Sequence, residues 1–339
     1  MEDDFRQQLQ SSDRSPAHLA LVDCLLDALV NGDPMPALDP ELARIVRDKS
    51  YWPMSRKEAL NILANHARSS NDRSTLQQLL KEIHSDTVED SEDELLGTLL
   101  FALYPSQLTP KEIWQYFRRP KSDRLIGSYW RFWHDFSQAT ARDEDLPVLL
   151  DALLQTGYQI NDQYDHLGSA KIIGQLLVRV VLAFGVQVAI PRLYKWLSLG
   201  VQTHYFCRLK HEHRDALQRW LNEHEPTYKA LYEHGLHTIA SNNDSTGRRL
   251  WEIQEILYHA QEPEDANLWY LTLAQSTQNE SLRHELIDAS FYYLRQNSGL
   301  DEAIQLLQKW SSDHPEDANW VANILSSTYP PSKDQQEKN

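Results

Sequence analysis

Apolar residues recur along this chain at the spacing expected for one buried face of an α-helix. Between Leu19 and Leu29 they lie three and four positions apart, and the turn sequence Asn-Gly-Asp-Pro at 31–34 ends the pattern. Comparable segments follow to the C-terminal end, each separated from the next by turn residues. The pattern predicts about sixteen short helices and no strand, so we expect an all-α protein.

The lengths of these helices favour a repeat architecture. Antiparallel helix pairs of about 40–47 residues are typical of HEAT repeats. A weak internal repeat supports this: Pro-Glu-Asp-Ala-Asn at 263–267 recurs at 315–319. Residues 300–325 also resemble a tetratricopeptide (TPR) unit. We therefore predict a right-handed α-solenoid of antiparallel, HEAT/TPR-like helix pairs, with an irregular helical bundle as the alternative.

The same pattern divides the chain into three parts. Residues 1–157 form a first set of HEAT-like helical repeats, and residues 158–328 form further repeats that are partly TPR-like. Periodicity ends at Tyr329-Pro330-Pro331, and the remaining residues are polar. We expect residues 329–339 to be a disordered tail.

Composition excludes several classes of protein. Only 11 of the 339 residues are glycine, which is unfavourable for hairpin-rich β folds and for phosphate-binding loops. The chain contains two cysteines and no segment that resembles a signal peptide or a membrane span. These features predict a cytoplasmic protein with no membrane association. The formal net charge of −16 opposes nucleic-acid binding.

Several local motifs have structural interpretations. Asp39 before Pro40 is expected to be a helix N-cap, and Thr109-Pro110-Lys111-Glu112 reads as a capping box. The acidic run 86–94 is interpreted as a solvated linker whose later carboxylates lie near a helix N-terminus. We expect Trp114 and Phe117 to be apolar anchors and Gly127 to allow close helix packing.

Basic and aromatic residues alternate after this capping box. Such a mixture indicates core packing with solvated arginines, a protein-binding surface, or phosphate contact combined with base stacking. Core packing is the favoured interpretation, and a protein interface comes next. The candidate partner-binding residues are Arg118, Arg119, Lys121, Arg124, Tyr129, Trp130, Arg131 and Trp133.

Histidine and cysteine residues raise the question of a metal site. His204, Cys207 and His211 share one face of a predicted helix, and zinc accepts these ligand types. No zinc-ligand motif accompanies them, so we favour packing by Cys207 and polar histidines on a wet face. His234 and His237 similarly suggest a partly exposed ridge. We expect no cofactor, no metal and no catalytic residue.

The middle of the first half carries a distinctive series of motifs. It contains Leu-Tyr-Pro at 103–105, Leu-Thr-Pro-Lys-Glu at 108–112, Pro-Lys at 120–121, Ile-Gly-Ser-Tyr at 126–129 and Asp-Leu-Pro at 145–147. This series resembles the helical-repeat region of bacterial NACHT-type signalling ATPases of the STAND class. The resemblance covers residues 40–157, and residues 42–64 resemble the HEAT-like repeats that precede these motifs.

This resemblance implies a sensor or regulatory arm, which in several such proteins serves antiviral defence. The chain lacks the phosphate-loop motif G-x-x-x-x-G-K-[ST], so nucleotide binding and hydrolysis are not implied. The leading hypothesis is a non-enzymatic protein-interaction module in a bacterial defence or stress system. The alternatives are a metal-binding protein or metal-dependent enzyme that uses the His/Cys face, and a nucleic-acid-binding protein that uses the basic aromatic segment.

Overall fold

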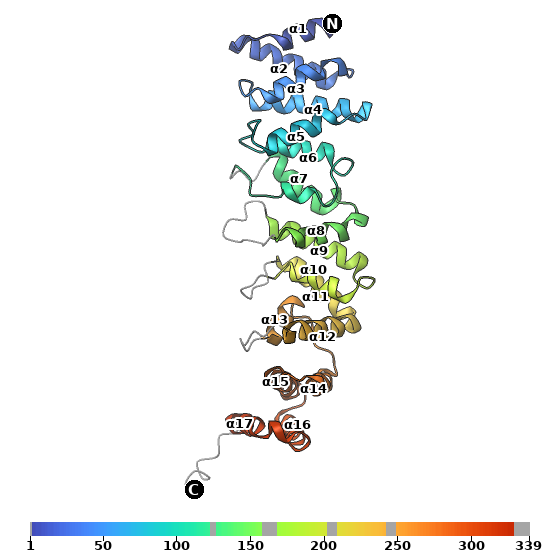
Figure 1. Cartoon of the computed structure of the whole chain (residues 1–339), viewed down its shortest axis with the longest axis vertical. Helices are drawn as coiled ribbons and strands as arrows, with labels where there is room; N and C mark the ends of the chain where they lie inside the picture. Colours follow the sequence, from blue (N-terminus) through green and yellow to red (C-terminus); the bar gives the residue numbers. More distant parts are fainter. Residues whose placement is uncertain (1, 123–126, 158–167, 202–208, 242–248, 329–339) are drawn as a thin grey trace. The chain divides into compact units, whose positions relative to one another are not determined.

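The computed structural model describes residues 2–122, 127–157, 168–201, 209–241 and 249–328. Over these residues the fold is helical without a strand (Figure 1), which confirms the predicted all-α class. The α-helices are α1 (Glu2–Gln10), α2 (Pro16–Asn31), α3 (Asp39–Arg47), α4 (Pro53–Ser70), α5 (Ser74–His84), α6 (Glu94–Leu103), α7 (Ser128–Asp135), α8 (Leu146–Thr156), α9 (Ser169–Phe184), α10 (Ile190–Ser198), α11 (His211–Glu223), α12 (Glu225–Ser241), α13 (Arg249–Ile256), α14 (Ala266–Ser276), α15 (Glu280–Asn297), α16 (Leu300–Asp313) and α17 (Ala318–Thr328). None of the described helices is both long enough and apolar enough to cross a bilayer.

Contacts between Cα atoms divide the chain into two compact units. Unit 1 comprises residues 1–188 and 195–216, and unit 2 comprises residues 189–194 and 217–339. The predicted boundary after residue 157 falls inside unit 1, where α8 and α9 pack against each other. The predicted tail, 329–339, lies outside the described residues.

In unit 1, helices pack both on their sequence neighbours and on the next helix but one. Helix α4 contacts α3, and α6 contacts α7, while α2, α4 and α6 pack in succession. The side chains between them, such as Leu26, Leu60 and Leu99, are completely buried. Burying these periodic apolar faces is the main driving force for helices of this length, which are marginal in isolation.

Helices α6 and α7 approach each other closely at Gly97. A Cβ atom at this position would lie 2.0 Å from the backbone nitrogen of Tyr129. Gly127, where the sequence suggested close packing, has φ +141° and lies against the Glu94 side chain instead. Of these two glycines, Gly97 inside α6 is therefore the one that lies against the backbone of the neighbouring helix.

Of the two N-capping interactions predicted from the sequence, the structure contains the one at Thr109 and not the one at Asp39. The capping box is confirmed, because Thr109 N donates to Glu112 Oε2 at 2.9 Å and Glu112 N donates to Thr109 Oγ1 at 3.3 Å. It precedes a short 3₁₀ helix, Ile113–Tyr116. The prediction for Asp39 is wrong: this residue belongs to the first turn of α3, and its carboxylate contacts His66 Nδ1 at 2.6 Å. A 3₁₀ turn before α3 displaces Asp39 from the capping position.

Unit 2 contains a completely buried carboxylate, that of Asp317. Arg283 of α15 donates to both of its oxygens, at 3.0 and 2.8 Å, and Trp310 Nε1 of α16 lies 3.0 Å away. Burial acts to raise the pKa of Asp317, but the hydrogen bonds from Arg283, Trp310 and His284 outweigh it and hold that pKa well below its usual range. This carboxylate therefore joins α15 and α16 to the start of α17.

The internal sequence repeat has a structural counterpart at this point. Asp265, the equivalent of Asp317 in the first Pro-Glu-Asp-Ala-Asn, accepts a hydrogen bond from Lys229 of α12 at 2.8 Å. In both copies a cation of one helix therefore pairs with the aspartate that precedes the next helix but one, α14 for Lys229 of α12 and α17 for Arg283 of α15. The side chain of Asp265 is 57% exposed, whereas that of Asp317 is buried.

We predict that Gly97→Ala destabilises the protein by about 2 kcal/mol or more, because overlap with the α7 backbone outweighs the helix propensity of alanine. Chemical denaturation of the full chain measures this. Gly235→Ala is the control, since its Cβ would meet only side-chain atoms, at 3.0 Å. An equal loss in the two variants would contradict the prediction.

We predict that Asp317→Asn costs about 3 kcal/mol at pH 7, because it leaves the Arg283 guanidinium without its buried partner. Asp265→Asn, the exposed equivalent, should cost less than about 1 kcal/mol. The native pKa of Asp317 is depressed, so its contribution is present above the unfolded pKa and is lost as the pH falls toward the native pKa. The stability difference between wild type and Asp317→Asn should consequently shrink below about pH 4.

Candidate functional site

Several hydrogen bonds to buried carboxylates lie at the start of α6. The side chain of Asp93 is 1% exposed and accepts a hydrogen bond from Arg118 Nη2 at 2.5 Å. Its second oxygen accepts the backbone N–H of Lys121 at 2.6 Å. Asp93 itself has a left-handed backbone conformation, with φ +58°. This buried ion pair fixes the segment 118–121 against the start of α6.

The predicted solvation of the acidic run is wrong for two of its members. Asp90 is buried beside Asp93, and its carboxylate oxygens accept the backbone N–H groups of Leu95 and Leu96 at 3.3 and 2.8 Å. Burial raises the pKa of Asp90, although these two hydrogen bonds act against it. These carboxylates do lie near a helix N-terminus, as predicted. They are buried there and accept hydrogen bonds within the protein instead of facing solvent.

The eight predicted partner-binding residues separate into several environments. Arg118 pairs with Asp93, and Lys121 Nζ lies 2.6 Å from Asp86. Tyr129 and Trp133 are buried, and the Tyr129 hydroxyl donates to the backbone carbonyl of Tyr116 at 2.6 Å.

The remaining four lie toward the surface or outside the described part of the chain. Arg119 and Arg131 are exposed, and Trp130 is half-buried, with its ring 3.8 Å from that of His134. Arg124 lies outside the described residues. The seven described residues therefore do not form a single surface patch.

Arg131 lines a surface groove of about 400 Å³ between three helices of unit 1. We call it the α4–α6–α7 groove. Its lining comprises Lys57, Asn61, Ala64, Asn65 and Arg68 of α4, Thr98, Phe101 and Ala102 of α6, and Ser128 and Arg131 of α7. Three of these residues are cationic and none is acidic, in a chain whose net charge is −16.

The cations of this groove differ in how firmly they are held. Lys57 Nζ donates to Glu94 Oε2 at 2.6 Å, and the same oxygen accepts the hydroxyl of Ser128 at 2.7 Å. Burial acts to raise the pKa of Glu94, but these hydrogen bonds outweigh it and lower that pKa. Arg131 makes an exposed contact with Asp135, at 3.3 Å.

Arg68 also interacts locally. Its Nη1 donates to Asn65 Oδ1 at 3.2 Å, one turn earlier in α4. Neither Arg68 nor Arg131 therefore depends on a buried partner for its position, and both guanidinium groups have donors to offer to a carboxylate. Lys57 and Arg68 were not among the predicted residues, because nothing in the local sequence of α4 separates them from other solvated charges.

The predicted metal face is only partly within the described residues. His204 and Cys207 lie outside them, and His211 Nδ1 accepts a hydrogen bond from Arg214 Nη2 at 2.8 Å. His213 is buried against Gly174, and burial lowers the pKa of its imidazole. No group of three potential metal ligands occurs in the described part of the chain.

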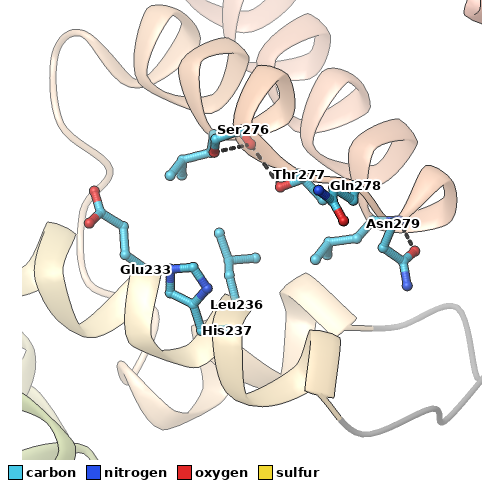
Figure 2. A pocket seen from close by; sticks show the side chains of 9 residues that line it. Glu233, Leu236, His237, Ser276, Thr277, Gln278 and Asn279 are labelled. Atoms are coloured by element: carbon cyan, nitrogen blue, oxygen red, sulfur yellow. Dashed lines mark hydrogen bonds between the residues drawn. The ribbon is translucent and has the colours of Figure 1, made fainter.

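A polar hollow of about 280 Å³ lies between α12 and the α14–α15 connection in unit 2. Figure 2 shows Glu233 and His237 on α12 facing Ser276, Thr277 and Asn279. The hydroxyls of Ser276 and Thr277 donate to the backbone carbonyl of Leu273, at 2.9 and 2.7 Å. The side chain of Asn279 accepts the backbone N–H of Leu282 and so caps α15. The Ser276 and Thr277 hydroxyls therefore end α14, and the Asn279 side chain begins α15.

Comparisons with protein-family models, with curated proteins and with solved structures give no match to this chain. The fold class and the candidate site consequently rest on the residues and contacts described above.

We predict that Arg118→Gln destabilises the protein by about 2 kcal/mol or more, because it leaves the buried Asp93 carboxylate without its cation. Arg131→Gln removes the same charge from the groove surface and should leave the unfolding midpoint nearly unchanged. Urea denaturation of both variants gives the comparison. Equal midpoints would show that the Asp93–Arg118 pair contributes no more than a surface contact.

Proposed function

We propose that this protein is a non-enzymatic helical-repeat module that binds another protein, with the α4–α6–α7 groove as the binding surface. The chemistry of the groove suggests an acidic segment of the partner as the ligand. The observation that carries this proposal is the lining itself: Lys57, Arg68 and Arg131 without a carboxylate among the lining residues.

Electrostatics on the scale of the groove makes this partner reasonable despite the acidity of the chain. Exposed charges farther apart than about 8–10 Å are largely screened at physiological ionic strength. A carboxylate in the groove would therefore interact mainly with nearby charges. These are Arg68 and Arg131, which make local contacts within their own helices, and Lys57, which already pairs with Glu94. Two arginines also provide planar, two-pronged donors, which suit carboxylates better than an isolated charge does.

The apolar part of the groove supports a protein ligand over a simple anion. Phe101 lies in the lining with Ala64 and Ala102, and its ring packs edge-on against Phe132 at 5.1 Å. A peptide that presents one apolar side chain among acidic ones would use both kinds of surface. Arginine and aromatic residues are also the side chains most often found to dominate binding energy at protein interfaces.

A right-handed α-solenoid of HEAT/TPR-like pairs is the architecture that we propose for this module. The successive packing of α2, α4 and α6 supports it, since stacked repeats place alternate helices in contact. The resemblance to NACHT-associated repeats further suggests a sensor or regulator in a bacterial defence or stress system. The small number of cysteines supports a cytoplasmic location.

The decisive experiment is to identify partners by affinity purification from the native organism and then to measure the binding of purified partner by calorimetry. We expect Arg68→Glu/Arg131→Glu to weaken binding by about tenfold or more, since two attractive contacts become repulsive. Lys49→Glu/Lys111→Glu is the matched control, because it makes the same change in charge at exposed positions that do not line the groove.

Three outcomes would contradict the proposal. Equal affinity of the two double variants would exclude the groove as the binding surface. Tight binding of duplex DNA that falls steeply with salt and is lost in Arg68→Glu/Arg131→Glu would favour a nucleic-acid ligand instead. Stoichiometric turnover of ATP by the purified chain would exclude a non-enzymatic role.

A further inference from the structure

A second groove, in unit 2, has the opposite chemical character. It has a volume of about 470 Å³ and lies between α13 and α15. We call it the α13–α15 groove. Its lining comprises Leu250, Trp251 and Gln254 of α13, and Glu285, Asp288, Ala289 and Tyr292 of α15. It contains two carboxylates and two large aromatic rings, and no cation.

The spacing along α15 explains why the groove combines these groups. Glu285, Asp288 and Tyr292 lie at i, i+3 and i+7, so they project from one face of the helix. Trp251 faces them from α13. Tyr292 is 55% exposed, which is unusual for a large aromatic side chain in a chain where most are buried. The aromatic and acidic groups are thus presented together at an accessible surface.

The two carboxylates are incompletely satisfied. Glu285 Oε2 accepts the backbone N–H of Leu250 at 3.3 Å, whereas its other oxygen, Oε1, is buried without a hydrogen-bond partner among the described residues. A buried oxygen of this kind is uncommon in folded proteins and calls for a donor. Asp288 lies one turn later, and burial raises its pKa to about 6. The charge of Glu285 also acts to raise this pKa, whereas that of His284 acts to lower it.

The chemistry of these groups selects one class of ligand. A metal ion would need a further ligand, and the described residues contain no suitable group of three. A guanidinium group offers several N–H donors in one plane, enough for two carboxylates at once. Its flat faces also stack on aromatic rings, with an attraction of about 0.5–2 kcal/mol for each favourable contact.

We propose that the α13–α15 groove binds an arginine side chain of a protein partner. The guanidinium donates to the Asp288 carboxylate and, after rotation of the Glu285 side chain into the groove, to the Glu285 carboxylate. It also stacks on Trp251 or Tyr292. The groove is open to solvent, so a peptide can insert an arginine side chain while its backbone stays at the surface. This proposal is independent of the α4–α6–α7 groove, and failure of either one leaves the other intact.

The test uses the full chain and a fluorescein-labelled hexapeptide in which three arginines alternate with glycines. Fluorescence anisotropy should show saturable binding that weakens about tenfold or more in Glu285→Gln/Asp288→Asn. The matched control is Glu302→Gln/Asp313→Asn, which removes the same two charges from exposed positions of α16. Tyr292→Ala should weaken binding severalfold without a change in charge, and Tyr292→Phe should restore it.

Peptides with other side chains separate guanidinium recognition from general attraction to an acidic protein. A peptide with citrulline in place of arginine, which keeps the shape and loses the charge, should not bind measurably. A lysine peptide should bind about tenfold more weakly than the arginine peptide. Equal loss of affinity in the two double variants, or equal affinity for the arginine and lysine peptides, would overturn the proposal. Circular dichroism and thermal unfolding of each variant verify that the fold is retained.

Discussion

The organisation of the candidate site in unit 1 depends on two adjacent carboxylates at the start of α6. Asp93 holds the segment 118–121 through Arg118, and Glu94 holds Lys57 of α4 and Ser128 of α7. The three helices that line the α4–α6–α7 groove are thus connected at one end by Glu94, the first residue of α6. These contacts add to the direct packing of α6 on α4 and on α7, which sets the positions of the groove cations relative to one another.

Buried carboxylates serve a similar purpose in unit 2, where Asp317 joins α15 and α16 to the start of α17. A carboxylate is expensive to bury, but it accepts several hydrogen bonds at once, so a single residue can orient donors from different helices. Breaking such a contact leaves a buried charge unpaired, which costs more than the intact pair contributes. An acidic chain rich in short helices can use part of its charge in this way.

Local patterns were sufficient to predict the helices, the all-α class and the capping box at Thr109, because these follow from spacing and capping chemistry within a few residues. Core packing, the favoured interpretation of the basic and aromatic segment, holds for Tyr129 and Trp133, although the sequence also offers both as candidate partner-binding residues. The burial of Asp93 could not be predicted. It depends on Arg118, 25 residues away, and short-range patterns contain no information about such a contact.

The two candidate surfaces consist of charges that the fold leaves on the outside. Arg118 and Arg131 looked equivalent in sequence, yet the first pairs with the buried Asp93, whereas the second makes an exposed contact within its own helix. The acidic residues divide in the same way: Asp317 is enclosed by its donors, while Glu285 has a buried oxygen that no donor of the described residues reaches. A charge whose partners are all internal stabilises the fold, whereas one that lacks them has its interaction capacity left for a ligand. By this criterion the basic groove of unit 1 and the acidic, aromatic groove of unit 2 are the places where partner binding would change the molecule least.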